Sequence, residues 1–269
     1  MSEAEVTTLS VVWMLLRRFV LLLLVLALLS YLGAVGLLYF RQRSILYYPS
    51  WAAAVDAPTL SVAVPGLTLQ GWAVNPGQPR ALLYFGGNAE AVEKNRDLFA
   101  TALPGYTVYL LPYRGYSGNP GAPTESDLYA DALVEFDQIR ARHVSVALIG
   151  RSLGSGIATY VAAHRPVERL VLVTPYDSIA NVAQGKYPLF PIGLLLKDKY
   201  ESWRRASDLT MPTLVLIAGR DMVIPRANTD ALIAAFKRKP EVVVIAGASH
   251  NDIAEDDGYR RDLAMFLTR

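Results

Sequence analysis

The run Gly-Arg-Ser-Leu-Gly at residues 150–154 constrains the fold of this chain more than any other feature. An apolar, β-branched stretch precedes it at residues 144–149, and small residues in a helical pattern follow at 155–163. A Gly-x-Ser-x-Gly run between a strand and a helix is typical of the nucleophile elbow, a tight turn that lifts a serine hydroxyl clear of a sheet. Glycines are needed there because the turn is strained and the helix must pass close to neighbouring backbone. The sequence therefore predicts a reactive serine at position 152.

Strand and helix patterns alternate along the chain on both sides of this turn. Eight short apolar segments predict strands, of which the first two form a hairpin or meander around Pro65 and Gly66; they are 59–64, 67–75, 80–85, 106–111, 144–149, 170–174, 213–218 and 242–246. Helices are expected at 89–103, 124–142, 155–163, 226–238 and 255–268, the second of them capped by Thr124. Repeated strand–helix–strand units favour a mostly parallel sheet with helices on both faces. We therefore predict an α/β-hydrolase fold with an eight-stranded sheet.

Residues 181–208 break this alternation. The stretch 187–196 is apolar and contains two prolines, and the stretch 197–205 after it is highly charged. We interpret the segment as a short cap that lies over the active site between two core strands. An ordinary crossover helix with a long loop stays open as the alternative.

The amino-terminal region contains an uncharged stretch of 22 residues, 19–40, with ten leucines. As a helix it would reach about 33 Å, enough to cross a hydrocarbon core of about 30 Å. We therefore expect a tail at 1–18, a transmembrane anchor at 19–40, a linker at 41–58 and a catalytic domain at 59–269. A cleaved signal peptide is the weaker alternative because the apolar run is long for one. The amino terminus is expected in the cytoplasm and the catalytic domain on the other side of the membrane.

Composition excludes several classes of function. The net charge of +2 gives no electrostatic support for binding nucleic acid. The chain has no cysteine, which excludes disulfides, thiolate catalysis and cysteine-ligated metal. Its three histidines are not paired at the spacing of a helical metal site; His143 precedes the elbow strand, at the wrong end of the sheet, and His164 closes the following helix. We expect neither a metal nor a cofactor.

Serine is a weak nucleophile at neutral pH, so Ser152 needs a nearby base, and that base needs a carboxylate to orient it. In an elbow-containing fold the three follow along the chain as Ser, then Asp or Glu, then His, each on a loop after a strand. Asp221 follows the predicted strand 213–218, and His250 follows the predicted strand 242–246. We therefore predict a catalytic triad of Ser152, Asp221 and His250.

Two other carboxylates lie near these positions in the sequence. Asp177 follows the predicted strand 170–174 and stays open as an alternative acid to Asp221. Asp252 is only two residues from His250, so a surface or supporting role is expected for it.

A serine hydrolase also needs two backbone N–H donors for the oxyanion of its intermediate. The residue after the nucleophile, Leu153, is expected to supply one. The second is expected from the glycine-containing loop 85–89, where Asn88 is the preferred donor and Gly87 or Ala89 the alternatives. A phosphate-binding loop is a weak rival interpretation because no lysine with serine or threonine follows the glycines.

Taken together, these residues resemble the membrane-anchored α/β-hydrolase-domain proteins of the serine aminopeptidase-like branch, which includes the yeast bud-emergence protein. The shared motifs span nearly the whole chain from residue 19; they lie at 44–49, 84–89, 113–118, 150–156, 219–221 and 249–250. The resemblance implies a hydrolase of esters, thioesters or amides that needs no cofactor. One departure is that Gly86 stands where the relatives usually carry a histidine before Gly-Asn, so altered loop geometry with retained activity is expected.

Three functional hypotheses follow. The leading one is a membrane-anchored serine hydrolase that forms an acyl-enzyme, and the apolar cap next to an anchor favours a lipidic or other small-molecule acyl substrate. An aminopeptidase-type serine peptidase would use the same triad, but no acidic site for a substrate amine is visible. A catalytically silent scaffold is the third hypothesis. The oligomeric state is left open by the sequence.

Overall fold

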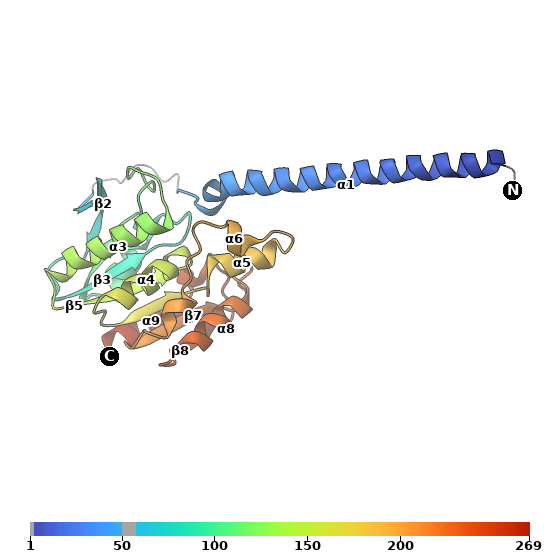
Figure 1. Cartoon of the computed structure of the whole chain (residues 1–269). Helices are drawn as coiled ribbons and strands as arrows, with labels where there is room; N and C mark the ends of the chain where they lie inside the picture. The colour runs from blue at the N-terminus through green and yellow to red at the C-terminus, as the bar shows by residue number, and fades with distance from the viewer. Residues whose placement is uncertain (1–2, 50–57) are drawn as a thin grey trace. The chain divides into compact units, whose positions relative to one another are not determined.

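The chain forms two compact units, Met1–Gln42 and Arg43–Arg269. The computed structural model describes residues 3–49 and 58–269 (Figure 1). Part of the predicted linker 41–58 therefore lies outside the described residues.

The first unit consists of most of one long helix, α1 (Glu3–Leu46). Its segment Val11–Leu46 has a mean hydropathy of 2.6 over its most apolar window, and none of that window is buried. The helix is therefore long and apolar enough to cross a membrane. It extends beyond the expected anchor 19–40 in both directions, because arginine is a good helix former and the charged flanks do not interrupt the backbone pattern.

The second unit is built on an eight-stranded sheet with the order β1-β2-β4-β3-β5-β6-β7-β8. Only β2 runs antiparallel to both of its neighbours, and every pairing from β4 to β8 is parallel. The strands are β1 (Leu60–Val64), β2 (Leu67–Val74), β3 (Arg80–Phe85), β4 (Tyr106–Leu110), β5 (Ser145–Arg151), β6 (Leu170–Val173), β7 (Thr213–Ala218) and β8 (Glu241–Ile245). The predicted hairpin and the mostly parallel eight-stranded sheet are confirmed.

Helices cover both faces of this sheet. Their bounds are η1 (Val92–Asn95), α2 (Arg96–Ala102), α3 (Glu125–Arg140), α4 (Leu153–His164), α5 (Ile179–Lys186), α6 (Ile192–Leu195), α7 (Trp203–Ala206), α8 (Arg226–Ala235), η2 (Ile253–Glu255) and α9 (Asp257–Thr268). Buried side chains of α3, α4, α7 and α8 share one apolar cluster with the sheet, and those of α2 and α9 share another.

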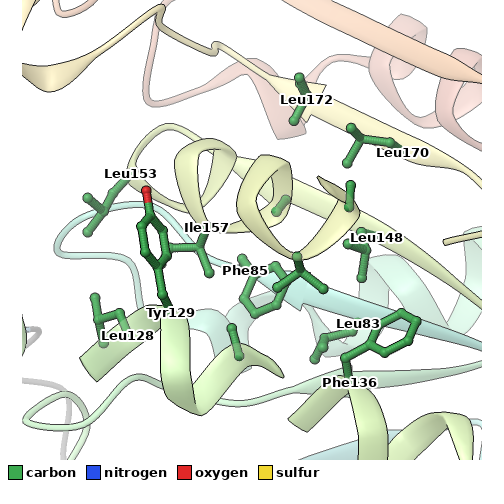
Figure 2. Packing of buried hydrophobic residues seen from close by; sticks show 14 of the residues in the cluster. Leu83, Phe85, Leu128, Tyr129, Phe136, Leu148, Leu153, Ile157, Leu170 and Leu172 are labelled. Atoms are coloured by element: carbon green, nitrogen blue, oxygen red, sulfur yellow. The ribbon is translucent and has the colours of Figure 1, made fainter. Parts of the chain in front are cut away.

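Strand β3 shows how the sheet separates these two clusters. Leu83 and Phe85 point into the cluster with α3 and α4, which Figure 2 shows from close by. Leu82 and Tyr84 point into the opposite cluster with α2 and α9. All four are at most 1% exposed, and burying one such side chain contributes about 1.5–3 kcal/mol. The central strands are thus fixed from both sides, which gives their carboxyl ends a rigid base.

Two predicted helices have other bounds in the structure, and the predicted N-cap residue of α3 is confirmed. The helix expected at 89–103 begins only at Val92 as a 3-10 turn, because Ala89 takes a φ of 60° that no helix accommodates. The helix expected at 226–238 ends at Ala235, because the next residue, Phe236, turns to extended backbone and is buried. Thr124 caps α3 as predicted, accepting the backbone N–H of Asp127 at 3.1 Å.

Candidate active site

Ser152 stands alone between β5 and α4, in a backbone conformation that few non-glycine residues adopt. Its φ is 50° and its ψ is −116°. Its backbone N–H donates to the carbonyl of Val173 in the neighbouring strand at 2.9 Å, which holds the turn against the sheet. Strained backbone of this kind occurs where the surrounding structure enforces it, most often at functional sites.

The glycines on either side of Ser152 allow this conformation. A Cβ on Gly150 would lie 2.6 Å from the Cβ of Ala158 in α4, well inside contact distance. A Cβ on Gly154 would overlap the backbone carbonyl of Phe85 at the end of β3. Helix α4 can therefore start this close to the sheet only if both positions lack a side chain.

The three residues that the sequence predicts for the triad lie together at the carboxyl end of the sheet. The Nε2 atom of His250 is 2.9 Å from the Oγ atom of Ser152. Its Nδ1 atom is 2.7 Å from the Oδ2 atom of Asp221. The side chains of His250 and Asp221 are each 9% exposed, so this contact is mostly shielded from water.

The carboxylate of Asp221 is held in its ionised form. Burial alone would raise its pKa, but hydrogen bonds from His250 and from backbone outweigh burial and leave the pKa below its usual value. The backbone N–H groups of Val223 and Ile224 donate to Oδ1 at 2.8 and 2.9 Å. With Oδ1 fixed by the backbone, Oδ2 faces the imidazole ring.

The alternative acid, Asp177, has other partners. It is 4% exposed, and its two oxygens accept hydrogen bonds from the side-chain amides of Asn181 and Asn228. Asp252 accepts the backbone N–H of Ser249 at 2.6 Å, so it orders the loop just before His250. Of the three candidate carboxylates, Asp221 is the one within hydrogen-bond distance of the imidazole.

The two other histidines lie in separate places. His143 contacts the hydroxyl of Tyr109 at 2.7 Å and the carbonyl of Gln78 at 2.9 Å. His164 at the end of α4 contacts the carbonyl of Tyr160 at 2.7 Å. Within residues 3–49 and 58–269, no group of three side chains of the metal-binding types gathers in one place.

The predicted oxyanion donors flank Ser152. Leu153 is the first residue of α4, so its N–H has no acceptor within the helix. A Cβ on Gly87 would lie 3.6 Å from the Cβ of Ser152, which places loop 85–89 beside the nucleophile. The N–H of Gly87 donates to the carboxylate of Glu90, which leaves Asn88 and Ala89 as the candidates for the second donor.

The side chain of Asn88 has a structural contact that the sequence did not reveal. Its amide nitrogen donates to the carbonyl of Leu46 at 2.6 Å, and its Oδ1 accepts the N–H of Tyr48 at 2.9 Å. The hydroxyl of Tyr116 donates to the same Oδ1 at 2.8 Å. The side chain therefore ties loop 85–89 to the first residues of the second unit, so Asn88 can serve the oxyanion through its backbone N–H and not through its side chain.

An ion pair between Arg151 and Glu90 lies beside the site and was not predicted from the sequence. The two side chains, each 12% exposed, approach to 3.1 Å. Burial alone would lower the pKa of Arg151, but the charge of Glu90 together with Tyr84 and Tyr259 outweighs burial, and the pKa is raised. The available signal was one charged residue beside each of the two glycine motifs, but these residues are 61 positions apart, and no local pattern indicates that they pair.

This ion pair joins three loops around Ser152. The guanidinium of Arg151 donates to the backbone carbonyls of His250 at 3.2 Å and Asn251 at 2.8 Å. The carboxylate of Glu90 accepts the N–H of Gly87 and, at 2.7 Å, the hydroxyl of Tyr84. The carboxylate of Glu90 therefore orders loop 85–89. The loop lacks the histidine that is usual in the family this chain resembles, where Gly86 stands here.

Comparison with known proteins places the chain among curated relatives. An uncharacterised protein of Mycobacterium tuberculosis is 34% identical over 246 residues, covering 84% of this chain and 86% of that protein. Alpha/beta hydrolase domain-containing protein 17B of Homo sapiens is 27% identical over 168 residues, covering 60% of this chain and 56% of that protein. No family model matches the chain.

Solved structures share the fold at low sequence identity. An esterase of Pyrococcus furiosus has a TM-score of 0.66 at 15% identity and covers 82% of this chain and 99% of its own. An enol-lactonase of Burkholderia xenovorans has a TM-score of 0.60 at 15% identity and covers 78% of this chain and 100% of its own. The two structures show a fold in common with this chain.

Proposed function

Because the chain belongs to the α/β-hydrolase family, we propose that it is a membrane-anchored serine hydrolase that cleaves an ester, thioester or amide through an acyl-enzyme. The observation that carries the proposal is the continuous line of contacts from Asp221 through His250 to Ser152, which ends at a strained turn.

The first half of the reaction transfers the acyl group to the enzyme. The Oγ atom of Ser152 attacks the carbonyl carbon of the substrate, and its proton moves to Nε2 of His250. The resulting oxyanion accepts hydrogen bonds from the N–H groups of Leu153 and Asn88. When the tetrahedral intermediate collapses, the bond to the leaving group breaks, and His250 returns the proton to that group.

The second half releases the acid. A water molecule gives a proton to Nε2 of His250 and attacks the acyl-enzyme carbonyl, and the second intermediate collapses as His250 protonates the departing Oγ of Ser152. Asp221 accepts a hydrogen bond from Nδ1 throughout, so it fixes the tautomer of the ring and stabilises the imidazolium. The ionised state of Asp221 in the folded protein supports this role.

Helix α1 supports the membrane part of the proposal. Its length and hydropathy match a single crossing. We propose that the amino terminus lies in the cytoplasm and the catalytic unit on the other side. The anchor would hold the site close to lipid, which favours substrates with an apolar acyl chain.

Labelling of the full chain in detergent with a fluorophosphonate probe tests the chemistry. The wild-type protein should be labelled rapidly, and Ser152→Ala should lose labelling while it keeps its folded circular dichroism spectrum. Ser145→Ala, at the opposite end of β5, is the matched control and should be labelled like the wild type. Persistent labelling of Ser152→Ala would overturn the assignment of the nucleophile, and an unlabelled wild type would favour the silent scaffold.

A further inference from the structure

An exposed apolar surface lies in the segment between β6 and β7. We call residues 187–195, which connect the end of α5 to the end of α6, the insertion tip. Leu189 is 80% exposed, Leu194 is 87% exposed and Tyr187 is 45% exposed. Soluble proteins rarely expose several large apolar side chains within one short segment unless that surface binds a partner.

The insertion tip has a defined shape. The side chain of Gln184 bridges it, donating to the carbonyl of Phe190 and accepting the N–H of Ile192, both at 3.1 Å. The ammonium of Lys199 donates to the carbonyl of Gly193 at 2.6 Å. Polar contacts therefore hold the backbone of the insertion tip, while the side chains of Leu189 and Leu194 are exposed to solvent.

On each side of the insertion tip, the nearest charged residue in the sequence is a lysine. Lys186 precedes it and Lys197 follows it closely, and both are exposed. The sequence has no aspartate or glutamate from residue 178 to residue 197. An apolar tip flanked by lysines matches the boundary between lipid headgroups and acyl chains, where apolar groups are buried and cations meet anionic lipid.

The chain itself ties this segment to the end of the anchor. Asp198, next to Lys197, accepts two hydrogen bonds from the guanidinium of Arg43 in a bidentate salt bridge, at 2.8 and 3.2 Å. Arg43 follows Phe40, the last residue of the apolar run, by three positions, and three residues span at most about 10 Å. The hydroxyl of Tyr47 adds a second attachment to Tyr200 at 2.8 Å. The insertion is therefore attached to the part of the second unit that follows the apolar run most closely along the chain.

We propose that the insertion tip docks on the lipid bilayer that holds α1, with Leu189 and Leu194 below the headgroups and the flanking lysines at their level. This inference rests on the membrane anchoring in the proposed function and adds a second, reversible contact with the same bilayer. The partner that the surface fits is an anionic lipid surface.

Spin labels on single cysteines test the proposal on the full chain. The native sequence has no cysteine, so Leu189→Cys and Leu194→Cys each give one labelling site. The variants are placed in vesicles of phosphatidylcholine and phosphatidylglycerol, and collision with oxygen is compared with collision with a water-soluble nickel chelate. Oxygen, which concentrates in the acyl region, should dominate at both tip sites.

The control is Val144→Cys, which is 73% exposed just before β5, at the opposite end of the strand from Ser152. The nickel chelate should dominate there. Nickel-dominated collisions at both tip sites, in protein that stays with the vesicles after alkaline washing, would overturn the docking and leave the anchor standing; a protein partner would then be the occupant to seek. Protein that washes off the vesicles would refute the anchor and the docking together.

Discussion

Ser152 combines a backbone strain of about 1–3 kcal/mol with a position in reach of an imidazole. The strain is held by the fold around it, since the turn is fixed by a hydrogen bond to β6 and by the close start of α4. A hydroxyl held in this way needs no rearrangement to meet a substrate carbonyl, which is the benefit of a preorganised nucleophile.

The assignment of the acid can be tested with a pair of variants. Asp221→Asn should lower kcat by roughly 10³–10⁴-fold with little change in KM, because an amide cannot hold the imidazole in the required tautomer. Asp177→Asn, in which the alternative acid is changed in the same way, should keep kcat within a few-fold of the wild type. Steady-state hydrolysis of an activated ester by both variants decides between them, and the opposite ranking would assign the role to Asp177.

At the scale of elements, the pair Arg151–Glu90 connects three loops that arise from three different strands. Arg151 touches neither the predicted oxyanion position nor the proton path by the contacts described, so it is a positioning residue. Its hydrogen bonds to the carbonyls of His250 and Asn251 hold the histidine loop against the nucleophile turn.

Arg151→Met should therefore lower kcat by about 10–100-fold while KM changes little, because a misplaced catalytic group costs rate more than binding. Arg151→Lys should restore part of the rate, since it keeps the charge opposite Glu90. Arg165→Met removes an exposed pair with Asp137 and serves as the control, with kcat unchanged. Equal losses in the Arg151→Met and Arg165→Met variants, or a loss confined to KM, would contradict the positioning role.

Helix α3 carries a buried carboxyl that makes stability depend on pH. Glu135 is 3% exposed, and burial together with the nearby charge of Asp131 raises its pKa to about 8 from its usual value of 4.5. The folded state therefore holds a proton that the unfolded state releases, so this group's contribution to stability is present below pH 4.5 and falls as the pH rises to about 8.

Glu135→Gln should remove that dependence, because its neutral amide has no proton to lose. Thermal unfolding of wild type and variant from pH 5 to pH 9 measures the difference, which is expected to reach a few kcal/mol at the alkaline end, since one pKa unit corresponds to about 1.36 kcal/mol. A variant whose melting temperature falls with pH as steeply as that of the wild type would show that another group is responsible.

At the scale of the whole molecule, the features that could be predicted from the sequence are those that depend on local residue patterns. Buried strands read as short apolar runs between turns, so β3 and β7 were predicted with the bounds that the structure has. Asp221 and His250 could be proposed because each follows such a strand, and parallel strands end at one edge of the sheet. The contacts from Asp221 to His250 and from His250 to Ser152 depend on the folded arrangement of the strands, and they are seen in the structure.

Features set by distant partners were not predictable in this way. The positive φ of Ala89 delays the helix after β3, and no local pattern announces it. The linker expected at 41–58 contains Tyr47, which is 4% exposed and hydrogen-bonded to Tyr200, 153 positions away. Such pairings depend on which surfaces meet after folding, and a single sequence carries little record of them.

The close approach of Gly154 to the end of β3 also limits which mutations this position tolerates during evolution. Any single-base change that replaces a glycine codon with another amino acid adds a side chain, and here the first carbon of that side chain would occupy the place of a backbone carbonyl. Gly185 and Gly193, which have nothing within 4 Å of an added Cβ, are under no such constraint. Amino-acid substitutions can therefore accumulate at positions 185 and 193, while position 154 requires glycine.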